Sequence, residues 1–372
     1  MAPPSRPVPN PRIVFTKRPG NGFPVVGEHI SLDNTRSIDL ERVLLNGGFL
    51  TKTLLLSPEP AMRERMRDPE IRSYTTTAIV GAPLVGFGLV VVLRSEKDGI
   101  KAGDHMFGMT PFEAYTLQPY IEGRVEYKES EWPAGTFDMD SLALQVVPDP
   151  QGAFPWSRYC SILGIPGLSA FAGFEAYANA QEGETIFVSS GASGVGSMVI
   201  QLAKMKGMKV IASAGTNKKV EHMKRLGADV AFNYNMSAVS DFLREHGPLD
   251  LFWDNVGGST LEAAIEHLTV YGRIIMCGSA SEYNIGLEDR HGIKNTSYIF
   301  KKRLTVQGFL IADHAAKMAP RFFSEVPALV AQGKLVSEEH LVHGIENGPA
   351  AFVDMLKGGR ALGKPVIVVA EE

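Results

Sequence analysis

The apolar positions between about Tyr159 and Ile311 follow two alternating periodicities. Short runs of β-branched and apolar residues, typical of buried strands, are separated by segments in which apolar residues recur every three or four positions, as on one face of a helix. The predicted strands cover residues 185–190, 209–214, 230–232, 249–256, 272–278 and 304–311, and the predicted helices cover residues 196–207, 218–226, 239–245 and 260–268. Strands that are apolar almost throughout and alternate with helices predict an α/β fold, with a parallel sheet covered by helices on both faces.

The first 150 residues have a different pattern, dense in proline and glycine, with short β-rich runs at residues 25–30, 42–45, 89–93 and 142–147. Such runs between many turns predict an irregular β-rich module. A charged segment at residues 62–70 is interpreted as a solvated loop or helix face. Near the C-terminus the pattern predicts a helix at 321–331 and strands at 341–345 and 365–370, too few to form a core, so we expect them to complete the N-terminal module. The predicted domains are residues 1–155 with 335–372, and residues 156–334.

Composition narrows the range of partners. The chain has 37 Lys and Arg against 41 Asp and Glu, a net charge of −4, so no basic excess points to a nucleic acid or an anionic membrane as a partner. No apolar run reaches the roughly 20 residues that a membrane-spanning helix needs, so we expect no membrane partner. Two cysteines, Cys160 and Cys277, cannot form a framework of disulfides. A reducing compartment, most simply the cytoplasm, is expected.

The strongest local motif is Ser190-Gly-Ala-Ser-Gly-Val-Gly196, which lies between a predicted strand and a predicted helix. Glycines at such a turn let the backbone approach a pyrophosphate, whose negative charge then lies at the N-terminus of the helix. The spacing is Gly-x-x-Gly-x-Gly, which differs from the commoner Gly-x-Gly-x-x-Gly. The motif predicts a dinucleotide cofactor, and the alternative is a tight turn without a ligand.

The end of the second predicted strand bears on which dinucleotide is bound. A site for NAD usually places Asp or Glu about 20 residues after the glycine motif, where it accepts a hydrogen bond from the ribose 2′-hydroxyl. Residues 213–219 contain no carboxylate but include Lys218 and Lys219. A lysine attracts the 2′-phosphate of NADP, so NADPH is favoured over NADH. The alternative is that both lysines only begin a solvated helix, although their charge there opposes the helix dipole.

The sequence predicts no metal site. The nine histidines are scattered, and there is no Cys-x-x-Cys motif and no His-Glu pair. Only His340 and His343 share a short spacing, and we expect them in an exposed connection between a helix and a strand. Cys277 follows an apolar strand and is interpreted as a small buried hydrophobic residue. The chemistry is therefore expected to depend on the nicotinamide and on hydrogen-bond donors.

Several motifs in one order between Gly164 and Phe309 resemble the zinc-independent branch of the medium-chain dehydrogenase/reductase superfamily. Within this branch the chain is most similar to the prostaglandin reductases and the plant alkenal double-bond reductases. The matching motifs are Gly164-Ile-Pro-Gly-Leu-Ser-Ala170, Glu182-Gly-Glu-Thr185, Phe232-Asn-Tyr234, Asp254-Asn-Val-Gly-Gly258, Tyr271-Gly-Arg273 and Cys277-Gly-Ser-Ala-Ser-Glu-Tyr-Asn284. The resemblance implies a Rossmann domain with a doubly wound parallel sheet plus a GroES-like β-rich domain, with the active site in the cleft between them.

The resemblance also implies an activity. The family consists of NADPH-dependent oxidoreductases acting on the CH-CH group, which reduce the carbon–carbon double bond of α,β-unsaturated aldehydes and ketones. Hydride goes to the β-carbon, and the oxygen of the resulting enolate needs a hydrogen-bond donor. Tyr283 is the candidate catalytic residue, expected to hydrogen-bond near the nicotinamide ribose, whose 2′-hydroxyl would reach the carbonyl oxygen. The proton for the α-carbon comes from Tyr283 or from water. The alternative for Tyr283 is a loop tyrosine with only a positional role.

The cofactor contacts follow from the same resemblance. The glycine motif is expected to bind the pyrophosphate, Lys219 and Tyr234 the 2′-phosphate, and the remaining residues the ribose and the nicotinamide. The expected cofactor-binding residues are Ser193, Gly194, Val195, Gly196, Lys219, Tyr234, Asn255, Cys277, Gly278, Tyr283, Phe309, Leu310 and Ile311. Relatives pair through their Rossmann sheets, so a homodimer is expected.

Three positions depart from the family pattern. Relatives have Asp-Pro-Tyr where this chain has Glu59-Pro-Ala61, and Ser193-Gly194 replaces a Gly-Ala order. An asparagine that touches the cofactor in relatives corresponds to about Ala361 in this chain. These differences predict an altered entrance and substrate range more readily than a lost reaction. Two alternative functions stay open, an NADPH-dependent quinone reductase and a non-catalytic NADP-binding protein of the same fold.

Overall fold

The computed structural model describes residues 6–71, 73–120, 142–359 and 361–371. Contacts within the chain divide it into two compact units. The first unit contains Met1–Cys160, His340–Gly359 and Pro365–Glu372, and the second contains Ser161–Glu339 and Arg360–Lys364. The division expected at residues 155 and 335 stays a prediction.

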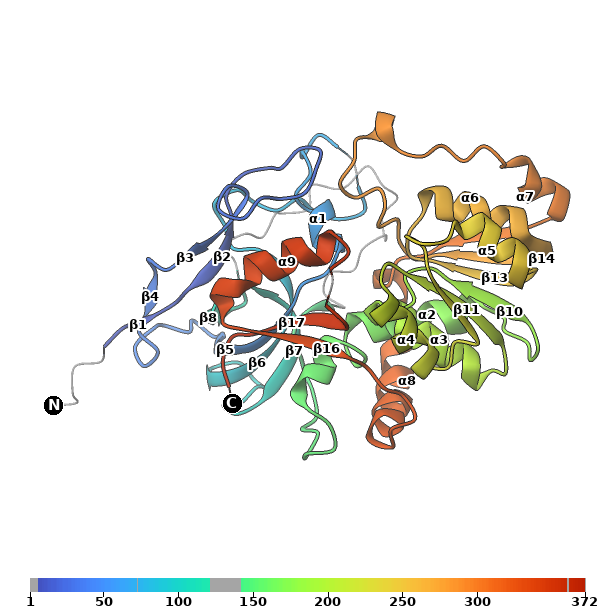
Figure 1. The fold of residues 1–372 in the computed structure, drawn as a ribbon. Coiled ribbons are helices and arrows are strands. Elements are labelled where there is room, and N and C mark those ends of the chain that lie inside the picture. Colours follow the sequence, from blue (N-terminus) through green and yellow to red (C-terminus); the bar gives the residue numbers. More distant parts are fainter. Residues whose placement is uncertain (1–5, 72, 121–141, 360, 372) are drawn as a thin grey trace. The chain divides into compact units, whose positions relative to one another are not determined.

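Six parallel strands form the sheet of the second unit (Figure 1). In spatial order they are β12 (Val230–Asn233), β11 (Lys209–Ala214), β10 (Thr185–Val188), β13 (Leu249–Asp254), β14 (Leu268–Met276) and β15 (Thr305–Gly308). The chain order reverses between β10 and β13, and open α/β sheets bind their ligands at the carboxyl ends of the strands beside such a reversal. This order is that of a Rossmann fold, and it confirms the predicted α/β fold class.

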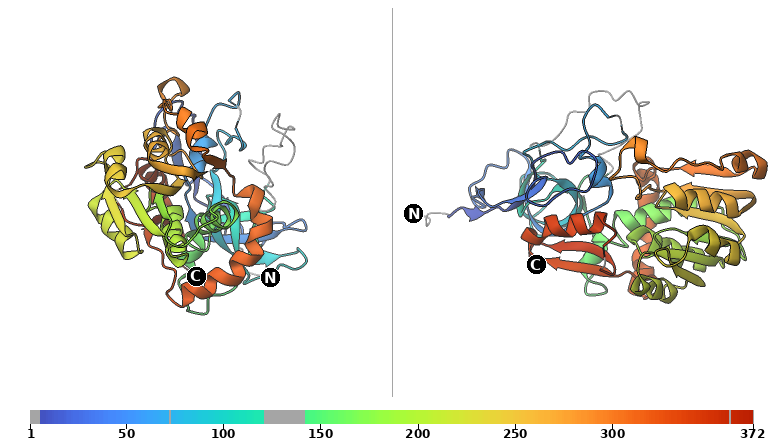
Figure 2. Two further views of the ribbon diagram at one scale, coloured as in Figure 1. Left: turned by 90° about the vertical axis from the view of Figure 1, so that its right-hand side faces the viewer. Right: turned by 45° about the horizontal axis from the view of Figure 1, so that its top comes forward.

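Helices cover both faces of this sheet (Figure 2). They are α2 (Ile165–Tyr177), α3 (Gly194–Met205), α4 (Asn217–Arg225), α5 (Val239–His246), α6 (Gly258–His267), α7 (Ser297–Lys302) and α8 (Ala312–Ala331), with a 3₁₀ turn, η3, at Leu287–Asp289. Helices α3 and α4 lie on one side of the sheet, and α5 and α6 lie on the other (Figure 1). Helix α2 is apolar on every side and buried from Pro166 to Phe174, because α3 and α8 pack against it.

Aromatic side chains anchor the sheet to the helices around it. Phe187 of β10 stacks on Phe252 of β13 with ring centroids 5.0 Å apart, and both rings are fully buried. Phe232 of β12 stacks on Phe242 of α5 at 4.0 Å. Because such rings remove large apolar areas from water, they hold the strands in register and fix the positions of the strand ends.

The first unit is β-rich and contains a seven-stranded sheet. The order of this sheet is β16 (Glu339–His343), β17 (Lys364–Val368), β5 (Phe49–Ser57), β6 (Val85–Ser95), β7 (His105–Pro111) and β9 (Gln145–Val146), and β8 (Tyr115–Gln118) also pairs with β5. Two smaller sheets pair β1 (Val8–Pro9) with β4 (Ser37–Ile38) and β2 (Arg12–Phe15) with β3 (Ile30–Asp33). The remaining elements are α1 (Ala61–Glu64), η2 (Trp156–Cys160), η4 (Ile345–Asn347) and α9 (Gly348–Leu356). Ile367 of β17 pairs with Leu56 of β5, so the C-terminal segment does return to the N-terminal module.

Several sequence expectations for the first unit were wrong. No strand forms at residues 42–45, and the run at 25–30 forms only an isolated bridge at Val26 before β3 begins at Ile30. The segment at 62–70 is not a solvated face, because Met62, Arg63 and Met66 are buried. The Arg63 guanidinium donates hydrogen bonds to the carbonyl oxygens of Gly20 and Gly22, so its charge is used to tie loops together.

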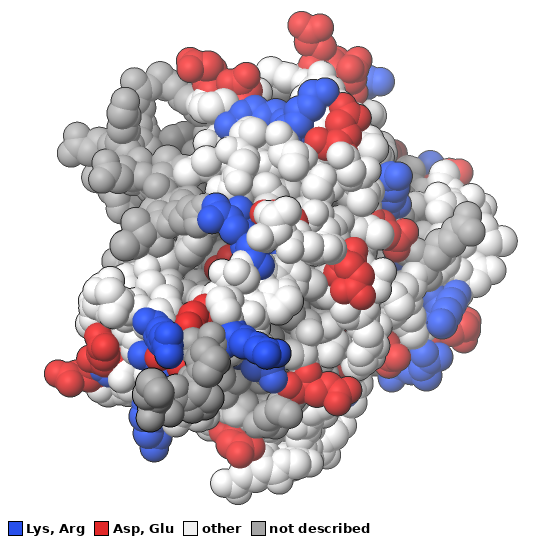
Figure 3. All heavy atoms as spheres, turned by 90° about the vertical axis from the view of Figure 1, so that its left-hand side faces the viewer, with Lys and Arg blue, Asp and Glu red and all other residues white. Residues whose placement is uncertain are grey.

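Acidic and basic side chains are interspersed on the face shown in Figure 3. Mixed charges of this kind give no large field of one sign on that face. Among the described residues, no helix combines the length and the apolar character needed to cross a bilayer.

Candidate functional site

The glycine motif forms the turn between β10 and α3. Ser193 is the N-cap of α3, and its hydroxyl oxygen accepts a hydrogen bond from the Gly196 N–H at 3.1 Å. The N–H groups of Gly194 and Val195, in the first turn, have no acceptor within the helix. The turn therefore presents backbone donors at a positive helix end, which suits a phosphate group.

The glycines of this turn are required by close packing. A Cβ atom on Gly196 would overlap the carbonyl oxygen of Ser190, and one on Gly191 would lie 2.6 Å from the sulfur of Met223. A Cβ on Gly194 would lie 2.9 Å from the Cβ of Pro166 in α2. Gly194, one of the departures from the family pattern, therefore leaves the room that Pro166 occupies.

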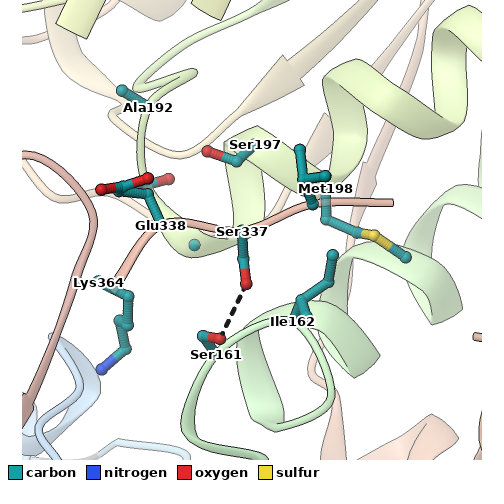
Figure 4. Close-up of a pocket in the computed structure, with 11 residues that line it drawn as sticks. Ser161, Ile162, Ala192, Ser197, Met198, Ser337, Glu338 and Lys364 are labelled. Carbon is teal, nitrogen blue, oxygen red and sulfur yellow. Dashed lines mark hydrogen bonds between the residues drawn. The ribbon is translucent and has the colours of Figure 1, made fainter. Parts of the chain in front are cut away.

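A pocket in the second unit lies beside the glycine motif (Figure 4). Its lining residues are Ser161, Ile162, Ala192, Ser193, Gly194, Ser197, Met198, Val336, Ser337, Glu338 and Lys364. In Figure 4 the Glu338 carboxylate lies on the side of Ala192, whereas the Lys364 amine points away from it. The side-chain amide of Gln201 in α3 holds this segment through both the N–H and the carbonyl of Val336, at 2.8 and 2.9 Å.

The sequence did not predict that residues 336–338 line a pocket beside the glycine motif. Ser337 donates a hydrogen bond to Glu339 at 2.6 Å, and Ser161 bonds to the same carboxylate oxygen. Ser161 and Ser337 also bond to each other at 3.2 Å (Figure 4). The one local signal was Gln201, a polar residue within the buried stretch of α3, because a buried amide needs partners from elsewhere in the chain.

Lys219 follows β11, and Tyr234 follows the neighbouring strand β12. Thr216 caps α4 by accepting a hydrogen bond from the Lys219 N–H at 3.3 Å, which puts Lys219 in the first turn of the helix. A Cβ on Gly215 would lie 2.7 Å from the hydroxyl oxygen of Tyr234, so the phenol lies directly over this glycine. Asn235 donates a hydrogen bond to the Gly215 carbonyl at 2.9 Å. This glycine cradle at a helix start fits a phosphate that an ammonium and a phenol would hold.

The two lysines of α4 differ in environment. Lys218 is exposed, whereas Lys219 is partly buried. Tyr234 is 46% exposed, so its ring is accessible beside the cradle. Lys219 therefore lies in the more restricted of the two positions, as expected for a residue that contacts a ligand.

The loops after β13 and β14 bring Asn255, Cys277, Gly278 and Tyr283 together. The N–H groups of Cys277 and Gly278 donate to the carbonyl oxygen of Asp254 at 2.8 and 3.1 Å. The Asn255 side chain donates to the Ser189 carbonyl at 2.7 Å and accepts from the Trp253 indole at 3.1 Å. Both ends of this amide are thus held by the protein.

Tyr283 folds back onto the start of its own loop. Its hydroxyl oxygen accepts a hydrogen bond from the Ser279 N–H at 3.3 Å. A Cβ on Gly278 would lie 3.1 Å from the same oxygen. The absence of a side chain at Gly278 therefore allows the phenol to lie against the backbone at this strand end.

Two titratable groups lie beneath these loops. Burial raises the pKa of the Asp254 carboxyl to about 6, although the N–H groups of Gly257 and Val256 oppose this shift. Burial, and to a lesser extent the Asp254 charge, raises the pKa of the Cys277 thiol to about 12. Cys277 is therefore protonated at neutral pH. It is partly exposed, and not the small buried residue that the sequence predicted.

Phe309 begins the last group of predicted residues. Its N–H donates to the carbonyl of Met276 at 3.4 Å, but its ring packs against Gly173 of α2, where a Cβ would lie 2.5 Å from the ring. The Phe309 ring also packs edge-to-face with the Trp253 ring, with the ring centroids 5.8 Å apart. Because the chain turns inward here, β15 ends at Gly308, and the strand predicted to reach residue 311 is shorter than expected.

Leu310 and Ile311 lie between this turn and α8, and both are partly exposed. The predicted helix at 321–331 in fact begins at Ala312. Tyr177 of α2 and His314 of α8 share a hydrogen bond of 3.0 Å beside Phe309. The sequence did not single out Gly173, Tyr177 or His314, because their contacts join elements that are distant along the chain.

The candidate metal ligands are not gathered into a centre. Within residues 6–71, 73–120, 142–359 and 361–371, no three His, Cys, Asp or Glu side chains are placed so that they could hold a metal ion. His340 and His343 are exposed on strand β16, not in the connection where they were expected.

Comparisons with known proteins cover most of the chain. One matching family model is described as a zinc-binding dehydrogenase, over residues 194–326, and another as an N-terminal domain of oxidoreductase, over residues 27–122. The 2-alkenal reductase (NADP(+)-dependent) of Nicotiana tabacum is 35% identical over 327 residues, which are 87% of this chain and 88% of the relative. Prostaglandin reductase 1 of Bos taurus is 32% identical over 280 residues, 74% of this chain and 84% of the relative.

A solved structure extends the likeness to three dimensions. The crystal structure of CurA from Vibrio vulnificus in complex with NADPH has a TM-score of 0.79 and 28% identity, covering 97% of this chain and 100% of that one. The sequence matches, the strand order and the glycine turn agree with the resemblance seen in the motifs. The chain therefore belongs to the zinc-independent medium-chain dehydrogenase/reductase superfamily, in the branch of the alkenal and prostaglandin reductases.

Proposed function

We propose that this protein is an NADPH-dependent reductase of the carbon–carbon double bond in α,β-unsaturated aldehydes and ketones. The observation that carries the proposal is the cradle at the end of β11, where the Tyr234 hydroxyl lies over Gly215 beside the start of α4. It supplies a place for a 2′-phosphate, and membership of the alkenal reductase branch supports the reaction. The cofactor is accordingly NADP, and the substrate partner is a small α,β-unsaturated carbonyl compound.

Different residues of the site bind different parts of the coenzyme. Ser193, Gly194, Val195 and Gly196 bind the pyrophosphate through the N-terminal end of α3. Lys219 and Tyr234 bind the 2′-phosphate. The residues assigned to the ribose and nicotinamide are Asn255, Cys277, Gly278, Tyr283, Phe309, Leu310 and Ile311. Bound NADPH supplies the hydride for the β-carbon of the substrate.

Tyr283 is proposed as the catalytic residue. The substrate oxygen gains negative charge as the enolate forms, and a donor placed in advance stabilises that charge. The Tyr283 hydroxyl oxygen accepts from the Ser279 N–H, and a hydroxyl that accepts a hydrogen bond becomes a stronger donor of its own proton. The same bond fixes the direction of the hydroxyl.

The choice of acceptor tests the function directly. NADPH oxidation followed by absorbance should be fast with an alkenal and an enone, and at least about tenfold slower in kcat/KM with a quinone, because the site is proposed to stabilise an enolate. Faster turnover of the quinone would favour a quinone reductase. Coenzyme binding without turnover of any acceptor in a broad panel would favour a non-catalytic protein.

Replacing Lys219 tests the coenzyme assignment. Lys219→Ala should raise the KM for NADPH by about tenfold or more and change that for NADH by less than about twofold, because only NADPH carries the 2′-phosphate. Lys218→Ala, a change of the exposed neighbour, is the matched control and should alter neither value. Equal effects of Lys219→Ala on the two coenzymes would contradict the assignment.

Replacing the Tyr283 hydroxyl tests the catalytic assignment. Tyr283→Phe should lower kcat at least about tenfold, because the donor to the enolate oxygen is lost while the ring remains. Tyr298→Phe is the control, since the Tyr298 ring packs beneath Lys302 at 5.1 Å in α7. An unchanged kcat for Tyr283→Phe would leave Tyr283 only a positional role.

We further propose a homodimer that forms through the edge of the parallel sheet. Strand β15 is an edge strand of the described sheet, and Val306 on it is 42% exposed; Val270 and Tyr271, near the start of the neighbouring β14, are exposed as well. Unpaired sheet edges favour association. Light scattering should give a dimer at micromolar concentration and a monomer for Val306→Lys, with Leu341→Lys as an exposed control. A monomeric wild-type protein would reject the dimer.

A cytoplasmic location is part of the same proposal. Both cysteines, Cys160 and Cys277, are free thiols. Free thiols without a disulfide framework are typical of proteins from reducing compartments.

A further inference from the structure

We infer that Asp254 is a positioning residue for the nicotinamide half of the coenzyme site, and that it acts by holding the loops that follow β10, β13 and β14. This inference rests on the coenzyme site of the proposed function. Asp254 ends β13, beside the reversal of the strand order, and is fully buried. It does not itself belong to the predicted set of cofactor contacts.

One carboxylate oxygen organises the turn after β13. The Oδ1 atom of Asp254 accepts hydrogen bonds from the N–H groups of Val256 and Gly257, both at 2.9 Å. Gly257 has a φ of +73° and Gly258 a φ of +54°, a conformation that glycine adopts without strain. The carboxylate thus fixes a sharp turn whose first residue is Asn255.

Ser189 links Asp254 to Asn255 through hydrogen bonds. The Ser189 hydroxyl donates to Asp254 Oδ1 at 3.2 Å and accepts from the Asn255 N–H at 2.9 Å. The Ser189 carbonyl accepts from the Asn255 side-chain amide at 2.7 Å. Asp254 therefore orients Ser189, and Ser189 holds both the backbone and the side chain of Asn255.

The loop after β14 is bonded to this turn along its length. The Ala280 N–H donates to the Asn255 carbonyl at 3.1 Å. The Ser281 N–H and hydroxyl both donate to the Val256 carbonyl, at 3.1 and 2.6 Å. The path of Cys277, Gly278 and the Tyr283 loop thus depends on the conformation that Asp254 imposes on residues 254–257.

The hydrogen bonding of Asp254 is better suited to positioning the loops than to stabilising the fold. Its Oδ2 atom is buried and has no hydrogen-bond partner among the described residues. A buried carboxylate oxygen without a hydrogen-bond donor lowers the free energy of unfolding, so stability alone does not explain an aspartate at this position. In return, an ionised carboxylate makes shorter and stronger hydrogen bonds to N–H and hydroxyl donors than a neutral acceptor does.

Asp250 at the other end of β13 provides a matched control. Its carboxylate also bridges three strands, because Oδ2 accepts from the Thr185 N–H at 2.9 Å and Oδ1 from the Thr269 hydroxyl at 3.1 Å. It lies at the amino end of the strand, away from the coenzyme loops. Its removal tests loss of a bridging carboxylate without loss of loop position.

The experiment measures binding of NADPH and of NADH by fluorescence, together with thermal unfolding, for the full-length variants. Asp254→Ala should weaken binding of both coenzymes by a similar factor, about tenfold or more, because the turn moves while the 2′-phosphate cradle at β11 stays intact. Asp254→Asn keeps an acceptor at the Oδ1 position but loses the charge, so it should recover only part of the affinity. Asp250→Ala should lower the unfolding temperature but change either affinity less than about twofold.

Other results would overturn the inference. Wild-type affinity in Asp254→Ala, or an equal loss in Asp250→Ala, would leave Asp254 no specific role. If Asp254→Ala does not fold, Ser189→Ala replaces it, and wild-type coenzyme affinity in that variant would likewise overturn the inference. Failure of the proposed function looks different, since a wild-type protein that binds NADPH but reduces no enone leaves the positioning test intact. A wild-type protein that binds neither coenzyme would reject both.

Discussion

The close approach of α3 to the end of β10 is the constraint on which the site depends. A Cβ on Gly196 would overlap the Ser190 carbonyl and lie 2.8 Å from the Cα of Gly191, so the helix can start here only because residue 196 is glycine. That contact aims the helix N-terminus along the carboxyl edge of the sheet. Because the strands are parallel, the ends of β11, β13 and β14 reach the same edge. This packing contact thus places the start of α3 at the edge of the sheet where these strands end.

The site combines donors of two kinds. At the glycine turn, the donors are backbone N–H groups, which suit a pyrophosphate without adding a formal charge to the chain. At the end of β11, the Tyr234 phenol lies over Gly215, where a larger residue would displace its hydroxyl, and Lys219 lies in the first turn of the helix that follows. This difference lets a nearly neutral protein, with a net charge of −4, hold a highly charged coenzyme. In the proposed function, the Lys219 charge at this place distinguishes NADPH from NADH.

Local patterns predicted the second unit well, because its strands and helices are each specified by neighbouring residues. The strand at 209–214 and the helix near 218–226 appear almost as expected. The β-rich unit was harder to predict, since short strands such as Gln145–Val146 depend on distant partners. The same limit applies within the site. Gln201 reaches Val336 across 135 positions, and Ser189 reaches Asp254 across 65, so no local pattern could pair them.

The Asp254 carboxylate also affects the pKa of a neighbouring thiol. Aldehydes and ketones with a conjugated double bond are electrophiles, and the thiolate form of cysteine is the one that attacks such carbons. Cys277 lies in the proposed site, but burial and the nearby Asp254 charge raise its pKa to about 12, so the thiolate is scarce at neutral pH. Cys160 is fully buried. Burial within these loops is thus the main reason that the Cys277 thiol stays protonated at neutral pH, and the Asp254 charge adds to it.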